Sequence, residues 1–124
     1  MKLEQKLIKK INLKKKNSRV YYVKKSNTEI SNNSIDMFKK LLKKNKQNIL
    51  RVCFHKNDKE QINEMLIITR NNFSNDPHRQ KKSSISYNIL KGKLNVNIYN
   101  NKKKIIKKYL LGERKNDLKF LRLK

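Results

Sequence analysis

Hydrophobic residues recur at two spacings along this chain, first at helical spacing and later at every second position. Between Ser34 and Lys44, one apolar stripe contains Ile35, Phe38, Leu41 and Leu42. Ser34 can cap this segment, and Asp36 lies in the first turn, where the helix dipole favours an anion. The pattern predicts one amphipathic helix over residues 34–44.

After this helix, apolar and polar residues alternate, which is typical of half-buried strands. The expected strands are 51–55, 64–69, 85–89, 94–98, 104–111 and 118–123. Short turns are expected at Lys91-Gly92 and at Asn100-Asn101. Successive strands with short turns, following a single helix, predict a mainly β chain that forms an antiparallel sheet or a small barrel.

The first 18 residues form a basic leader that we place outside the domain, which we expect to span residues 19–124. In the leader, Leu3, Leu7, Ile8 and Ile11 recur at helical spacing among lysines. Two interpretations are open: a frayed Lys-rich extension, which we favour, and a short amphipathic helix for an anionic surface. The run Val-Tyr-Tyr-Val that follows has strand-forming residues but little length.

The composition excludes several classes of protein. No apolar run approaches the roughly 18 residues of a membrane span. Cys53 is the one cysteine, so an internal disulfide and paired-cysteine zinc sites are excluded, and a reducing, cytoplasmic location is expected. We interpret Cys53 as a packing residue. Neither a dinucleotide-binding nor a P-loop glycine motif is present, which leaves nucleotide-loop enzymes without support.

The charge is extreme for a chain of 124 residues: Lys+Arg 34 against Asp+Glu 9 gives a formal net charge of +25. The chain has 28 lysines, 18 asparagines and 13 isoleucines but no alanine. This bias indicates an AT-rich genome, so part of the charge reflects codon usage and not a binding partner.

Four blocks occur in a recognisable order. They are Arg51–Asp58 (RVCFHKND), Glu64–Ile67 (EMLI), Pro77-His78-Arg79 with Tyr87–Gly92 (YNILKG), and Leu111-Gly112 with Lys119-Phe120 and Arg122-Leu123. In this order they resemble the WbuC-type cupin metalloproteins, small bacterial cupins usually associated with O-antigen and other surface-polysaccharide gene clusters. The resemblance covers about residues 20–124 and implies a cupin-like jelly-roll barrel with one helix before it.

The resemblance also implies a divalent metal held by imidazoles and a carboxylate. Its first histidine falls on His78, its second on Gln80, its glutamate on Ile85 and a further histidine on Asn88. The last histidine would lie beyond Lys124, so we expect a barrel that is incomplete at its C-terminus. One imidazole and one amide hold a metal poorly, so we expect no cofactor. If the site still binds, His78 and Gln80 would hold nickel, zinc, manganese or iron.

Five residues are candidates for a small-molecule site in the barrel mouth. Glu64 and His78 are the candidate acid–base pair, and His55, Arg79 and Asn88 are the candidate ligand-binding residues. The expected ligand is a sugar or a sugar phosphate, and whether the chain is an enzyme is left open. Three of the five also have a structural interpretation: Glu64 as an exposed edge residue, and the two histidines as packed side chains.

Three further alternatives concern the whole chain. A basic nucleic-acid-binding or ribosome-associated protein would use the positive charge and exposed aromatic side chains. Against this, lysines are spread along the chain and arginines are few. An open barrel edge would favour a homodimer. Finally, the loss of ligands is also what a decayed gene remnant would show.

Overall fold

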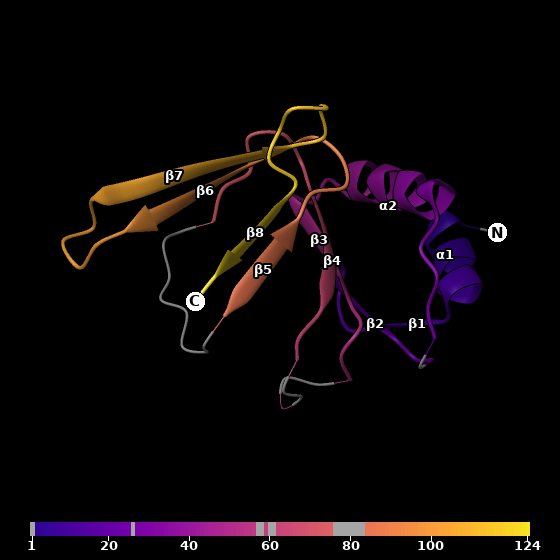
Figure 1. The fold of residues 1–124 in the computed structure, drawn as a ribbon. Coiled ribbons are helices and arrows are strands. Elements are labelled where there is room, and N and C mark those ends of the chain that lie inside the picture. Colours follow the sequence, from indigo (N-terminus) through magenta and orange to yellow (C-terminus); the bar gives the residue numbers. More distant parts are fainter. Residues whose placement is uncertain (1, 26, 57–58, 60–61, 76–83) are drawn as a thin grey trace. The chain divides into compact units, whose positions relative to one another are not determined.

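The computed structural model describes residues 2–25, 27–56, 59, 62–75 and 84–124. It divides the chain into two compact units, unit 1 (Met1–Ser74) and unit 2 (Asn75–Lys124). The described elements are mostly strands, which confirms the mainly β class (Figure 1). The described strands form one four-stranded and two two-stranded sheets and do not close into a barrel.

Unit 1 combines two helices with a four-stranded sheet. Its elements are α1 (Leu3–Ile11), β1 (Leu13–Lys15), β2 (Val20–Val23), α2 (Asn32–Lys44), β3 (Ile49–Cys53) and β4 (Met65–Thr69). The sheet order is β1-β2-β3-β4. The β1–β2 and β3–β4 pairs are antiparallel, but β2 and β3 are parallel. This parallel pair departs from the antiparallel sheet expected from the sequence, because α2 forms a crossover that returns the chain in the same direction.

The predicted helix is present as α2, and its start differs by two residues. Ser31 is the N-cap, and its side chain accepts a hydrogen bond from the Ser34 backbone N–H at 3.2 Å. Ser34 is therefore inside the helix and buried, and the prediction that it caps the helix is wrong. Asn45 is the C-cap, so the helix ends at Lys44, as the predicted range 34–44 requires. The four stripe residues are all buried, which confirms the predicted core face.

The expectation of a single helix is wrong, because the leader forms α1. Leu7 and Ile11 are buried in the core of unit 1, and Leu3 and Ile8 pack against it. Asn12 ends the helix in the left-handed conformation with φ 61°. A nine-residue helix is marginal alone in water. It is stable here because its apolar stripe packs against the rest of unit 1, and that stripe is consequently not available to a membrane.

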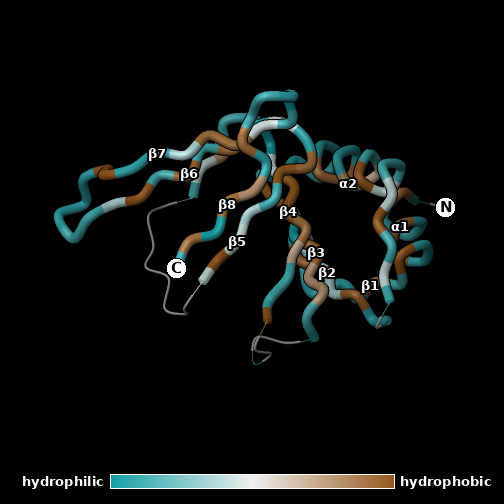
Figure 2. Tube along the Cα trace, viewed as in Figure 1, coloured by the Kyte–Doolittle hydropathy of each residue, from teal (hydrophilic) through white to brown (hydrophobic). Residues whose placement is uncertain are grey.

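One continuous core holds unit 1 together. Its buried members are Leu7, Ile11, Leu13, Tyr21, Phe38, Leu41, Leu42, Leu50, Val52 and Ile68. They come from both helices and all four strands. Figure 2 shows hydrophobic residues along β3 and β4. No helix in the described ranges is long and apolar enough to cross a membrane.

Unit 2 consists of two antiparallel strand pairs. Its strands are β5 (Ile85–Asn88), β6 (Lys93–Tyr99), β7 (Ile105–Gly112) and β8 (Phe120–Leu123). β5 pairs with β8, and β6 pairs with β7. Both predicted turns are present: Gly92 has φ 80°, and the Asn100 side chain accepts hydrogen bonds from the backbone N–H groups of Lys102 and Lys104.

The core of unit 2 is small. Its buried residues in the described part are Val96, Leu111 and Leu121, and three of the side chains packed around them, Tyr87, Ile89 and Leu123, come from β5, from just after β5 and from β8. Several large apolar side chains of this unit stay exposed: Leu90, Leu94, Tyr99, Ile105, Ile106, Leu110, Leu118 and Phe120. Within the described residues of unit 2, few side chains are therefore buried.

Candidate functional site

His55 and Glu64 meet where β3 and β4 end. The Phe54 backbone N–H donates to the Glu64 carbonyl at 2.9 Å, which extends the β3–β4 ladder by one bond beyond Cys53. The Glu64 backbone then hydrogen-bonds His55 Nδ1 at 3.2 Å. The imidazole thus takes the place of a backbone hydrogen-bonding group at the end of the ladder.

His55 Nδ1 lies 3.2 Å from the Glu64 backbone nitrogen and 3.2 Å from the Glu64 carbonyl oxygen. With the ring proton on Nε2 the Nδ1 atom accepts from the N–H, and with the proton on Nδ1 it donates to the carbonyl, so either tautomer ties the ring to the Glu64 backbone. The imidazole is 3% exposed, and the Tyr22 ring meets it edge-on with centroids 6.0 Å apart. The structure therefore uses His55 to join β2 to the end of the β3–β4 pair.

The side chains of the other two described candidates are solvent-exposed. Glu64 contacts His55 through its backbone, and its carboxylate lies on the surface of unit 1. Asn88 is exposed on β5 of unit 2, where it pairs in register with Phe120. His78, Arg79 and Gln80 lie outside the described residues. Of the predicted site residues, the structure brings together His55 and Glu64.

The described residues do not fit the metal implied by the resemblance. Ile85, at the position of the expected carboxylate, is half-buried and pairs in register with Leu123. Asn88 offers an amide where an imidazole is expected. Within the described ranges, no group of three His, Cys, Asp or Glu side chains is placed to hold a metal ion. The two expected ligands, His78 and Gln80, lie outside the described residues, so the absence of a bound metal stays a prediction.

A shallow groove lies along one face of the β6–β7 pair. Its volume is about 340 Å³, and it is lined by Asn95, Asn97, Lys108, Tyr109 and Leu110. Asn95, Asn97 and Lys108 share one face of the pair in this register, and their amide and ammonium groups can hydrogen-bond a polar ligand. None of these residues was a sequence candidate; the alternation of asparagines along residues 94–98 was the available signal.

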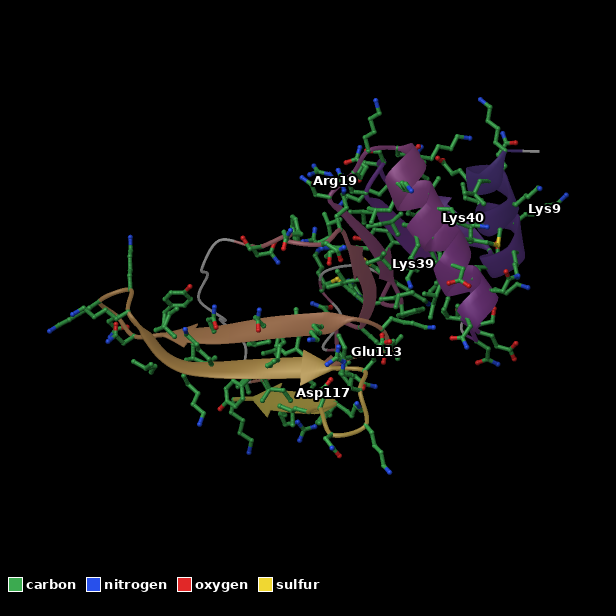
Figure 3. The ribbon with its side chains drawn as sticks, turned by 90° about the horizontal axis from the view of Figure 1, so that it is seen from above. Lys9, Arg19, Lys39, Lys40, Glu113 and Asp117 are labelled. Carbon is green, nitrogen blue, oxygen red and sulfur yellow. The ribbon has the colours of Figure 1, made fainter. Side chains whose placement is uncertain are left out.

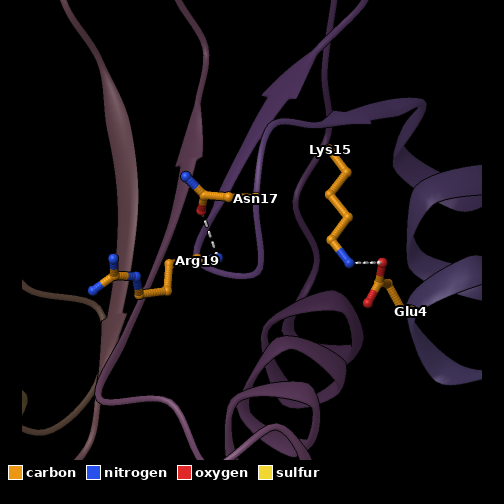
Figure 4. A network of polar contacts seen from close by, with 4 residues as sticks. All are labelled: Glu4, Lys15, Asn17 and Arg19. Carbon is orange, nitrogen blue, oxygen red and sulfur yellow. Dashed lines mark hydrogen bonds and ion pairs between the residues drawn. The ribbon is translucent and has the colours of Figure 1, made fainter.

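Sequence reasoning also missed a polar cluster between α1 and the sheet. Lys15 Nζ lies 2.8 Å from Glu4 Oε1, and Arg19 N donates to Asn17 Oδ1 at 2.8 Å in the following turn (Figure 4). Tyr21 is 1% exposed, and among the described residues no group meets normal hydrogen-bond geometry with its hydroxyl. Burial is the main cause that raises the pKa of Tyr21 to about 12, and the nearby Glu4 carboxylate adds to the shift through its charge and as a weak acceptor for the hydroxyl.

Tyr21→Phe should change how the stability of unit 1 depends on pH. The pKa of Tyr21 in the folded protein, about 12, lies above its ordinary value of 10.0. The protonated phenol therefore contributes to the free energy of unfolding in full below pH 10, and this contribution is lost as the pH rises towards 12. Below pH 10 the variant should be as stable as the wild type or up to about 1 kcal/mol more stable, because a buried hydroxyl without a well-formed hydrogen bond disappears. Urea melts between pH 8 and pH 11.5 measure both effects, and identical pH profiles for the two proteins would contradict them.

Comparison with protein-family models, curated proteins and solved structures finds no match for this chain. The resemblance to WbuC-type cupins therefore depends on the order and spacing of the blocks described above. The structure by itself defines a mainly β chain of two units, with two helices among the described residues.

Proposed function

We propose that this chain is a degenerate WbuC-like cupin that has lost its metal site and binds a sugar or sugar phosphate. The biological setting implied by the resemblance is bacterial surface-polysaccharide or sugar metabolism. The observation that carries the proposal is that the blocks of the resemblance occupy neighbouring hydrogen-bonded strands within each unit.

In unit 1, the first two blocks are neighbouring antiparallel strands. Arg51 pairs with Ile67 and Cys53 with Met65, so residues 51–54 and 64–67 meet over their whole length. Strands that follow one another in sequence commonly pair, and this register brings the two blocks alongside each other. The pairing supports reading the two blocks as a single structural motif.

In unit 2, the third and fourth blocks are neighbours in the same manner. Asn88 pairs with Phe120, and the Ile89 N–H donates to the Lys119 carbonyl at 3.0 Å. The glycine of the fourth block, Gly112, donates its N–H to Leu118 at 3.0 Å. The next residue, Glu113, donates its own N–H to the carbonyl of Gly92 at 3.1 Å. The ends of these blocks therefore converge around the turn at Gly92.

The expected ligand chemistry follows from the residues that remain. Ile85 stands at the position of the expected carboxylate, so the proposed ligand is held by polar side chains and not by a metal. Asn88 supplies an exposed amide that can hydrogen-bond hydroxyl groups, and Arg79 supplies a guanidinium suited to phosphate. The high positive charge favours a phosphorylated sugar over a neutral one.

Thermal melts of nucleic-acid-free protein test this proposal. UDP-glucose or glucose 1-phosphate should raise the melting temperature, because a ligand that binds the folded state stabilises it by about 2.7 kcal/mol at one hundred times its Kd. Inorganic phosphate and glucose, each at the same concentration and ionic strength, should give a smaller shift. Equal shifts with phosphate alone, or no shift with any sugar phosphate, would contradict the proposal.

A pair of matched variants separates a site from general charge attraction. Arg79→Gln should reduce the sugar-phosphate shift, and Arg114→Gln, which removes the same charge from an exposed position, should preserve it. An equal reduction in both variants would mean that net charge alone attracts the ligand, and would overturn the assignment of Arg79.

A further inference from the structure

The two helices of unit 1 carry a regular array of lysines that the proposed function does not use. The lysine layer consists of Lys2, Lys6, Lys9, Lys10, Lys39, Lys40, Lys43 and Lys44, all of them exposed. The first four belong to α1 and its N-cap, and the other four to the second half of α2. The two helices contact one another, and Figure 3 labels Lys9 on α1 and Lys39 and Lys40 on α2.

Little negative charge offsets this layer. Its two helices contain two carboxylates, Glu4 and Asp36. Glu4 is already paired with Lys15 on β1, and no ion pair of a layer lysine is found in the described part of the chain. On α2, Lys39 and Lys43 form one i,i+4 row and Lys40 and Lys44 another, so the charges repeat about every 6 Å along the helix.

The apolar sides of both helices face the core of unit 1, and this distinguishes between a membrane and a nucleic acid as the partner of the lysine layer. Leu7, Ile11, Phe38, Leu41 and Leu42 are buried in the core of unit 1. The outward surface therefore lacks the apolar or aromatic side chains that insert into the interfacial region of a membrane. It offers ammonium groups on a rigid two-helix platform, and lysines act as point charges towards phosphate.

We propose that the lysine layer binds the phosphate backbone of a nucleic acid without reading its sequence. Each lysine–phosphate contact releases counterions, so the affinity should fall steeply as salt is added. The slope of the logarithm of the binding constant against the logarithm of the salt concentration should become more negative by about 0.9 for each contact. The inference is independent of the proposed sugar-phosphate site, because none of its lysines is a residue assigned to that site.

The test compares two variants that lose the same number of charges. The layer variant carries Lys39→Gln, Lys40→Gln, Lys43→Gln and Lys44→Gln. The control variant carries Lys91→Gln, Lys93→Gln, Lys102→Gln and Lys104→Gln, all exposed positions in unit 2. Glutamine has nearly the helix propensity of lysine, so α2 should persist in the layer variant, and circular dichroism checks this.

Fluorescence anisotropy with a 20-base-pair duplex of mixed sequence, from 50 to 300 mM NaCl, gives the affinities. The layer variant should bind about tenfold or more weakly at 100 mM NaCl, with a salt slope reduced by up to about four. The control should stay within about twofold of the wild type. Equal losses in the two variants, or a greater loss in the control, would overturn the proposal.

Two additional measurements make the assignment stricter. A variant with Lys6→Gln, Lys9→Gln and Lys10→Gln tests the α1 half of the layer, and should also bind more weakly than the control if the layer acts as one surface. If the α2 variant loses helix content, the affinity of this α1 variant tests whether the lysine layer binds the duplex. Vesicles containing phosphatidylglycerol test a membrane instead: tighter binding to these than to the duplex at 150 mM NaCl, lost in the layer variant, would contradict a nucleic-acid partner.

Discussion

Phe38→Ala should cost unit 1 about 3–5 kcal/mol of unfolding free energy, the largest effect expected from a single substitution in this chain. Phe38 is fully buried on α2, at the centre of the cluster that joins both helices to the sheet. Its truncation leaves a cavity that residues of α1, α2 and the sheet would all have to fill. Urea unfolding followed by circular dichroism at 222 nm measures the loss, because both helices belong to unit 1.

Two comparisons show whether the loss comes from the cavity. Phe38→Leu keeps most of the side-chain volume and should cost clearly less than the alanine variant. Phe120→Ala removes the same ring from a side chain that is 53% exposed, and should change stability by less than about 1 kcal/mol. Similar losses at positions 38 and 120 would contradict the assignment of the core.

Leu111→Ala should lower the unfolding free energy of unit 2 by about 2–5 kcal/mol, because few other buried side chains of this unit could move to fill the cavity. The adjacent Leu110 provides a matched control: Leu111 is 0% exposed and Leu110 is 52% exposed, on opposite faces of β7. Leu110→Ala should therefore cost much less. Amide hydrogen exchange of β6 and β7 reports on this unit directly, and equal acceleration of exchange in the two variants would contradict the register of the β6–β7 pair.

The elements that sequence predicted best are those whose signals are local. The apolar residues of α2 recur at helical spacing within the helix itself, and the turns at Gly92 and Asn100 contain residues that favour turn conformations. The residues from Leu94 to Ile98 alternate strictly, and β6 contains them all. In each case the pattern lies within one element, so no knowledge of its partner was required.

The prediction that the leader is a frayed extension was wrong because the stability of α1 comes from contacts outside the helix. Its lysines made it resemble a frayed extension, and its stripe of apolar residues is stabilised by contacts with distant parts of unit 1. The parallel pairing of β2 with β3 was missed for a related reason. It depends on the crossover through α2, and the short run at Val20–Val23 does not indicate its partner.

Sequence predicted some features of the candidate site and missed others. Sequence placed His55 at the end of a strand, but did not predict the hydrogen bond to the Glu64 backbone that fixes its ring. It also missed Tyr21, whose burial depends on α1 and the sheet together. Side-chain environments of this kind arise from contacts between elements, which the spacing of residues within one element does not contain.

The most direct test of the account is a thermal melt of nucleic-acid-free protein, first with chelator and then with excess nickel, zinc, manganese or iron(II). The account predicts one cooperative transition that none of the metals raises, together with the shift produced by a sugar phosphate. An upward shift of several degrees with one metal would show binding to the folded state. That result would contradict the claim that replacing the expected ligands by Gln80 and Ile85 has removed the metal site, and the absence of any cooperative transition would contradict a working folded protein.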